Sequence, residues 1–158
     1  MRNTFANELY KHMEKNVDIF LLTGDLGYHV FDDIKKDFPD RFLNVGAAEQ
    51  AMMDIAIGLS LEGKIPFVYS ITPFLIYRPF ESLRTYIDHE KLNVKLVGSG
   101  RDADYAHDGF SHNASDVWAI LSQLPSIIQY YPIDKAQIPD LVSAMLEKKG
   151  PEFLSLKR

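Results

Sequence analysis

Residues 17–27 read VDIFLLTGDLG, and this stretch decides the fold class. Residues 17–22 place apolar side chains on both faces, which is typical of a central parallel strand covered on both sides. The glycines of residues 23–27 then end the strand in a turn. Residues 4–15, before the strand, have apolar side chains at helical spacing. A helix, a buried strand and a turn indicate an α/β protein.

The same alternation continues along the chain and predicts parallel strands joined by right-handed helical crossovers. Further strands are expected at residues 42–45, 66–71, 94–97, 127–131 and 153–156. Further helices are expected at residues 31–38, 49–61, 73–90, 114–124 and 138–148. We therefore predict a doubly wound, mainly parallel six-stranded sheet with helices on both faces, in a single domain over residues 1–158.

The composition excludes several classes of protein. A chain of 158 residues with 46% hydrophobic content can bury one sizeable core. No apolar run approaches the roughly 18 residues of a membrane span, and residues 1–16 do not resemble a signal peptide, so we expect a soluble protein. The absence of cysteine removes disulfides and thiolate chemistry and fits a cytoplasmic location. The net charge of −5, spread along the chain, argues against a nucleic-acid partner.

Ligands of open α/β sheets bind beyond the carboxyl ends of the strands. One polar residue there is Glu49, at the start of a helix that is apolar almost all round and is therefore expected to be buried. The helix N-terminus favours the carboxylate, whereas burial favours the neutral acid. Glu49 is either a proton-sharing group or an ordinary acid of a first helical turn.

Aromatic and histidine residues near the same edge also have two interpretations each. Phe74 and Tyr77 lie three residues apart at a helix start, so their rings can line one pocket or belong to the core. His107 and His112 lie among aspartates, but their spacing matches no strong metal signature, and a solvated loop has the same composition.

Four segments resemble successive landmarks of the transketolase pyrimidine-binding domain. They are NVGAAEQ at 44–50, GLSLEG at 58–63, TPFLIY at 72–77 and DGFSH at 108–112. The resemblance covers essentially the whole chain and implies the thiamine-diphosphate-binding fold. It also implies a transketolase subunit, which transfers a two-carbon ketol unit from a ketose or ketose phosphate to an aldehyde.

The resemblance implies roles for individual residues at a thiamine diphosphate site. Glu49 would hydrogen-bond the pyrimidine ring nitrogen and act in catalysis. Phe74 and Tyr77 would enclose the pyrimidine, and Asp25 and Leu26 would lie beside the cofactor.

The resemblance likewise implies a substrate site. Asp108 and His112 match the aspartate and histidine that contact the sugar, and His112 would also act in catalysis. Arg2, Thr23 and Arg158 align with groups that bind the substrate phosphate. Arg78 is a further basic residue near the expected pocket.

The chain departs from the family in two places. Ser99-Gly100-Arg101 stands where transketolases have Thr-His-Asp, and His107 replaces an acid, which leaves the identity of the sugar open. The Gly-Asp-Gly and downstream asparagine that hold Mg²⁺ in the family are absent, because Gly24-Asp25-Leu26-Gly27 lacks the third glycine in place.

The missing Mg²⁺ motif and the resemblance together imply a diphosphate-binding partner subunit that holds Mg²⁺. They also imply a heterotetramer of two plus two subunits built on a homodimer. The chain is then either a separate subunit, which the initial methionine favours, or one domain of a longer protein. Two other functions stay open. One is a subunit of a thiamine-dependent 2-oxoacid decarboxylase or dehydrogenase, and the other is a non-catalytic regulatory module of the same fold.

Overall fold

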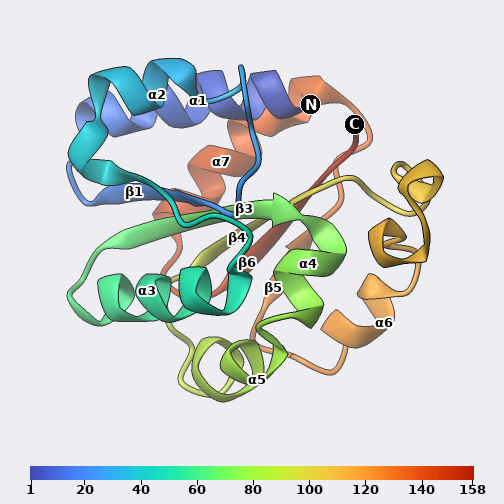
Figure 1. Cartoon of the computed structure of the whole chain (residues 1–158). Coiled ribbons are helices and arrows are strands. Elements are labelled where there is room, and N and C mark those ends of the chain that lie inside the picture. The colour runs from blue at the N-terminus through green and yellow to red at the C-terminus, as the bar shows by residue number, and fades with distance from the viewer.

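Six parallel strands form the central sheet of the computed structural model, which describes residues 1–158 (Figure 1). They are β1 (Ile19–Thr23), β2 (Phe42–Asn44), β3 (Ile65–Ile71), β4 (Lys95–Ser99), β5 (Ile128–Tyr130) and β6 (Glu152–Leu156). The strand order is β2-β1-β3-β4-β6-β5. The predicted six-stranded sheet is confirmed, and every neighbouring pair of strands is parallel.

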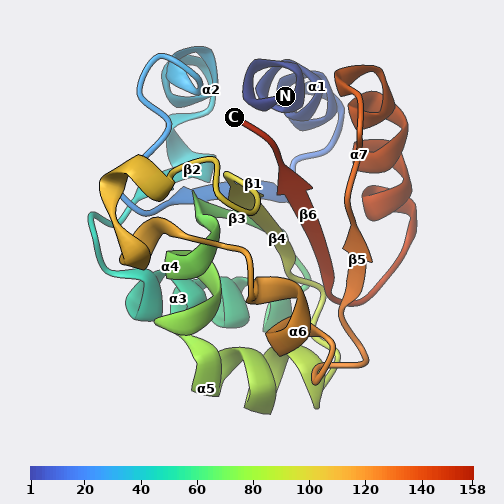
Figure 2. The same ribbon diagram turned by 90° about the vertical axis from the view of Figure 1, so that its right-hand side faces the viewer.

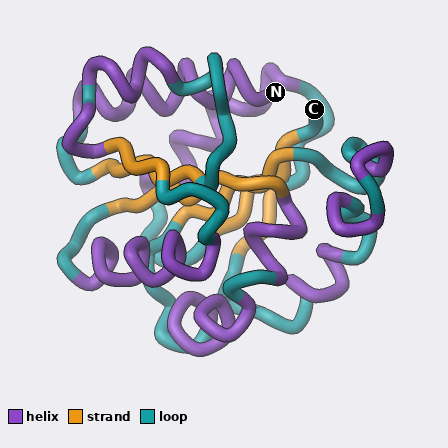
Figure 3. The backbone as a smooth tube through the Cα atoms, in the orientation of Figure 1, coloured by secondary structure: helices purple, strands orange, loops and turns teal.

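Helices cover both faces of the sheet and make three layers (Figures 1 and 3). One face carries α1 (Arg2–Lys15), α2 (Asp32–Asp37) and α7 (Ile138–Glu147). The other carries α3 (Glu49–Leu61), α4 (Thr72–Tyr77), α5 (Phe80–Ser82) and α6 (Val117–Leu121). Short 3₁₀ turns lie at Pro39–Arg41, Ala106–Asp108, Phe110–His112 and Lys135–Gln137. The doubly wound arrangement is as predicted.

Alternation along the strands divides the core in two. Leu22 and Val68 point toward α3 and belong to one apolar cluster, while Leu21 and Phe67 point toward α1 and belong to the other. All four side chains are at most 1% exposed. Because both faces are covered, only the ends of the strands are left for polar functional groups.

The helix predicted over residues 73–90 is wrong as a single element. The chain forms α4 up to Tyr77, then the short α5, then a π-helical segment over Leu83–Asp88. Pro79 causes the break, because proline has no N–H and its ring collides with the carbonyl of the previous turn. Arg78 is consequently placed at the end of α4, just before the proline.

A buried ion pair lies at the amino ends of the strands. Lys95 and Glu152 begin the neighbouring strands β4 and β6 and are register partners. The Lys95 Nζ lies 2.6 Å from Glu152 Oε2 and donates to the carbonyls of Lys148 and Gly150 at 3.0 Å. Burial lowers the pKa of Lys95, which the charge of Glu152 partly offsets. The pair therefore lies at the opposite edge of the sheet from the carboxyl ends of the strands.

Candidate active site

Glu49 is buried where three elements meet at the carboxyl edge of the sheet. It is the first residue of α3 and is 2% exposed. The hydroxyl of Ser70, near the end of β3, donates to Glu49 Oε1 at 3.2 Å. A Cβ placed on Gly24, just after β1, would lie 3.3 Å from both that oxygen and the Ser70 hydroxyl. Glycine at position 24 therefore leaves room beside the carboxylate.

Arg78 joins Glu49 to Phe74, another of the predicted site residues. Its Nη1 lies 2.5 Å from Glu49 Oε2, and its guanidinium carbon lies 3.8 Å from the centroid of the Phe74 ring. The ring of His112 meets Phe74 edge to face at 4.8 Å. We call Glu49, Ser70, Phe74, Arg78 and His112 the Glu49 cluster. Glu49, Phe74 and His112, which the sequence analysis assigned to one site, thus lie together.

Tyr77 is oriented by a different partner. Its hydroxyl donates to Asp116 Oδ1 at 2.5 Å, and its side chain is partly exposed. Burial, followed by this hydrogen bond and the charge of Asp116, raises the pKa of Tyr77. No interaction joins Tyr77 to the Phe74 ring in the structure. Its contact with a pyrimidine stays a prediction.

Asp25 and Leu26 lie in the turn after β1. The backbone N–H of Asp25 donates to Asn44 Oδ1, as does that of Gly46, both at 3.0 Å. Asn44 thereby fixes this turn next to the start of α3. The Tyr28 hydroxyl donates to the Asp25 carboxylate, and Leu26 packs at the border of the core. Asn44 has a positioning role that the sequence analysis missed.

A second polar cluster surrounds Tyr105. Arg2 Nη1 donates to the Tyr105 hydroxyl at 3.4 Å, and Ser99 Oγ lies 3.2 Å from the same oxygen. The guanidinium carbon of Arg158 lies 5.2 Å from the Tyr105 ring centroid, and Arg158 Nη1 lies 3.2 Å from His107 Nε2. We call these five residues the Tyr105 cluster. It brings together Arg2 and Arg158, which lie at opposite ends of the sequence.

Thr23 is fully buried, and no hydrogen bond joins its side chain to either cluster. It pairs in register with Tyr69, and the hydroxyls of both residues are buried without a hydrogen-bond partner. Thr23 points to the face of the sheet that carries α1, because Leu22 before it points to the other face. Its predicted contact with a substrate phosphate stays a prediction.

The loop after β4, drawn in yellow to orange in Figure 2, contributes residues to both clusters. His107 Nε2 lies 3.3 Å from the carboxylate of Asp108, next to Arg158 of the Tyr105 cluster. His112, farther along, belongs to the Glu49 cluster through Phe74. The loop thus places the two predicted substrate residues, Asp108 and His112, at the carboxyl edge of the sheet.

The Tyr105 ring occupies the space where a side chain at position 100 would begin. A Cβ on Gly100 would lie 2.3 Å from two ring carbons of Tyr105, and the backbone there has a φ of +82°. Arg101, the next residue, donates to Ser155 and to the Pro132 carbonyl, which belong to neither cluster. An aromatic ring from the following loop therefore fills the space beside Gly100, the position where the family pattern has a histidine.

Gly100→Ala should lower the free energy of unfolding by about 2–5 kcal/mol, since it combines left-handed backbone strain with overpacking against Tyr105. Gly63→Ala is the matched control, because Gly63 has a φ of +79° and no atom within 4 Å of its Cβ position. Gly63→Ala should lose only the stability that backbone strain costs. Adding Tyr105→Ala to Gly100→Ala should remove the further loss that comes from overpacking. Equal losses of stability for Gly100→Ala and Gly63→Ala, measured by denaturant unfolding, would contradict a clash with Tyr105.

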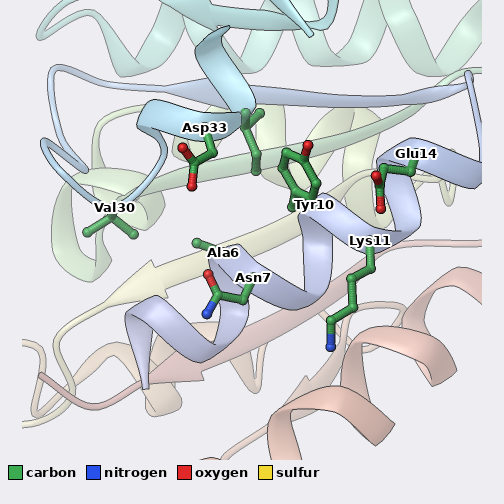
Figure 4. A pocket seen from close by; sticks show the side chains of 8 residues that line it. Ala6, Asn7, Tyr10, Lys11, Glu14, Val30 and Asp33 are labelled. Carbon is green, nitrogen blue, oxygen red and sulfur yellow. The ribbon is translucent and has the colours of Figure 1, made fainter. Parts of the chain in front are cut away.

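A surface groove lies away from both clusters. It has a volume of about 470 Å³ and runs between α1 and α2, lined by residues such as Ala6, Tyr10 and Asp33 (Figure 4). None of the predicted site residues lines it.

No group of three or more His, Asp or Glu side chains is arranged to hold a metal ion. No helix has the length and apolar character required to cross a lipid bilayer.

Comparison with known proteins identifies the family. The family model described as "Transketolase, pyrimidine binding domain" matches residues 1–158. The chain belongs to the transketolase pyrimidine-binding domain family. This pyrimidine-binding domain is 32% identical over 159 residues to the "Putative transketolase C-terminal section" of Methanocaldococcus jannaschii. The match covers 100% of this chain and 50% of that protein. The domain is 30% identical to the "6-deoxy-6-sulfo-D-fructose transketolase subunit SqwH" of a Clostridium species, over 100% of this chain and 49% of that subunit.

Solved structures agree with this assignment. One described as "Split gene transketolase, inactive beta4 tetramer" superposes with a TM-score of 0.87 at 35% identity, over 99% of this domain and 51% of that chain. Transketolase from Campylobacter jejuni superposes with a TM-score of 0.88 at 17% identity, which shows the shared fold. The predicted family and fold are confirmed. The domain spans about half the length of these curated relatives.

Proposed function

We propose that this domain supplies the pyrimidine side of a thiamine diphosphate site in a transketolase. The enzyme would transfer a two-carbon ketol unit from a ketose or ketose phosphate to an aldehyde. The observation that carries the proposal is the buried carboxylate of Glu49, which lies at a helix start and shares a planar cationic partner with the Phe74 ring.

The residues present fit an aminopyrimidine. Glu49 offers a buried acceptor with no side chain at Gly24 beside it, and Phe74 offers a ring face. The guanidinium of Arg78 shows that a flat group with in-plane N–H donors is accommodated between them. Glu49 and Phe74, with Asp25, Leu26 and Tyr77 around them, are the residues that would hold the pyrimidine of thiamine diphosphate.

Each residue then has a defined task. Thiamine diphosphate supplies, when bound, the nucleophilic carbon that a two-carbon transfer requires. Glu49 would share a proton with the pyrimidine ring nitrogen at Oε2, which is a form of general acid–base catalysis. Phe74 would fix the plane of the ring and exclude water from it. His112, in contact with Phe74, would face the reacting end of the sugar.

The far end of the sugar would reach the Tyr105 cluster. Arg2 and Arg158 both border Tyr105, so two guanidinium groups are available to an anionic group such as a phosphate. Asp108 and Thr23 are proposed to contact the same substrate. The replacement of the family's histidine by Gly100 sets this substrate end apart from that of other transketolases.

A diphosphate-binding subunit would complete the site and hold Mg²⁺, in a cytoplasmic heterotetramer of two plus two subunits. The descriptions of the relatives support a divided enzyme, because a protein described as a transketolase section and another described as a transketolase subunit match the whole of this domain. Hydroxyl, carboxylate and guanidinium groups here serve the pyrimidine and the sugar, and none is grouped to hold a metal.

Cofactor binding by the mixed subunits tests the proposal. The domain and a subunit carrying a Gly-Asp-Gly and asparagine motif are titrated with thiamine diphosphate and Mg²⁺, separately and together, by calorimetry. Binding that appears only in the mixture is the expected result, and no binding in the mixture would contradict the proposal. Product analysis with ketose phosphates and with 2-oxoacids then separates a transketolase from a 2-oxoacid decarboxylase.

A further inference from the structure

Arg78 makes two contacts with the surfaces that the proposed function assigns to the pyrimidine. Its Nη1 lies 2.5 Å from Glu49 Oε2, and its guanidinium carbon lies 3.8 Å from the centre of the Phe74 ring. The Glu49 side chain is 1% exposed, whereas that of Arg78 is 44% exposed. One end of this ion pair is therefore fixed in the interior, and the other reaches water.

The guanidinium resembles an aminopyrimidine in the features that these surfaces recognise. Both are flat and delocalised, and both can present N–H donors in the plane of the group. Stacking on Phe74 uses the flat face, and the bond to Glu49 uses an in-plane donor. Because one ring face and one carboxylate oxygen are already engaged, a pyrimidine cannot make the same two contacts while Arg78 keeps them.

A physical reason for this arrangement is the cost of a buried carboxylate. Glu49 has only the Ser70 hydroxyl as another side-chain donor, so without Arg78 its charge would be buried with little compensation. Arg78 supplies the missing charge, and its stem comes from the end of α4, where Pro79 has stopped the helix. Its guanidinium makes no other hydrogen bond, so it can rotate into water without breaking the fold.

We propose that Arg78 occupies the aminopyrimidine position in the unloaded domain and is displaced when the cofactor binds. This inference rests on the proposed function and adds a competition within the site. The apparent affinity for the cofactor is then lowered by the fraction of molecules in which Arg78 holds Glu49. Displacement also frees Oε2 of Glu49 from a permanent cation, which a carboxylate that shares a proton requires.

Substitution of Arg78 gives opposite results for an occupant and for a binding residue. In the complex with the diphosphate-binding subunit, Arg78→Gln should bind thiamine diphosphate roughly tenfold more tightly, since the competing guanidinium is gone. Arg78→Lys keeps the charge but lacks the flat fork, so it should give a smaller gain. Arg84→Gln is the control, because Arg84 is exposed and its side chain makes no ion pair or hydrogen bond.

Two readouts separate the possible failures. Unchanged or weaker binding by Arg78→Gln and Arg78→Lys, with normal binding by the wild type, would overturn this inference and leave the proposed function standing. No binding by the wild-type complex would overturn the proposed function as well. In the free domain, the side-chain N–H signal of Arg78 in NMR should shift on Glu49→Gln, and should move to the position of an exposed arginine when the loaded complex forms. A signal that stays at its free-domain position in the loaded complex would also overturn the inference.

Discussion

Glu49→Gln is expected to lower the turnover number of the assembled enzyme by about 10²- to 10⁴-fold, the range typical of a lost general acid–base group. Glutamine has nearly the same shape, and its amide oxygen can still accept from the Ser70 hydroxyl. It cannot share a proton with a ring nitrogen. The loss should therefore appear in the rate of two-carbon transfer, measured by product formation at saturating cofactor and substrate, with the subunits still assembled.

Glu62→Gln is the matched control, because Glu62 follows the last turn of the same helix and is exposed. It should leave the rate unchanged. Full activity of Glu49→Gln would contradict a catalytic role. If biological activity also survives Glu49→Ala, the domain would instead be the non-catalytic regulatory module that the sequence left open.

Lys95→Met is expected to lower the free energy of unfolding by about 3–5 kcal/mol, because it leaves the charge of Glu152 buried without its partner. Glu152 is 1% exposed, and its remaining side-chain donor is the Tyr130 hydroxyl at 2.7 Å. The pair lies at the amino ends of β4 and β6, opposite the Glu49 cluster. Denaturant unfolding should therefore show a large loss of stability, while the folded variant keeps its turnover number.

Lys149→Met serves as the control, since Lys149 is exposed and forms no ion pair. It should change stability by less than about 0.5 kcal/mol. The double variant Lys95→Met/Glu152→Leu should regain part of the loss, because it removes both charges together. Equal stabilities for Lys95→Met and Lys149→Met would show that the buried pair contributes nothing.

The regular elements could largely be predicted from the sequence. The predicted helix at residues 49–61 coincides with α3, because its apolar pattern is long and begins directly after small residues. The six strands also lie where apolar runs occur. Two predicted helices differ from the structure. The helix expected at residues 114–124 forms only over Val117–Leu121. In the segment after Pro73, a helical pattern continues through Pro79, where the α-helix breaks. The helical propensity of that segment is overridden at Pro79, because proline has no backbone N–H to donate.

The site was predictable only in part. The resemblance to transketolases named Glu49, Phe74 and His112, and the structure brings these three together. It did not reveal that Arg78 links Glu49 to Phe74, nor that Tyr105 fills the space above Gly100. No local pattern marks either residue, because an arginine after an aromatic helix start and a tyrosine in a polar loop are ordinary features of a surface.

The sequence by itself determined the order of the elements, the two-sided burial of the strands and the family to which the domain belongs. These depend on periodicity and on short motifs, which are local properties of the chain. Only the tertiary structure decided which charges meet, such as Arg78 with Glu49 and Lys95 with Glu152, and that Arg2 and Arg158 both border Tyr105. The partners in each case come from separate elements. Their distance is set by how the strands and helices pack in the fold, and not by their spacing in the sequence.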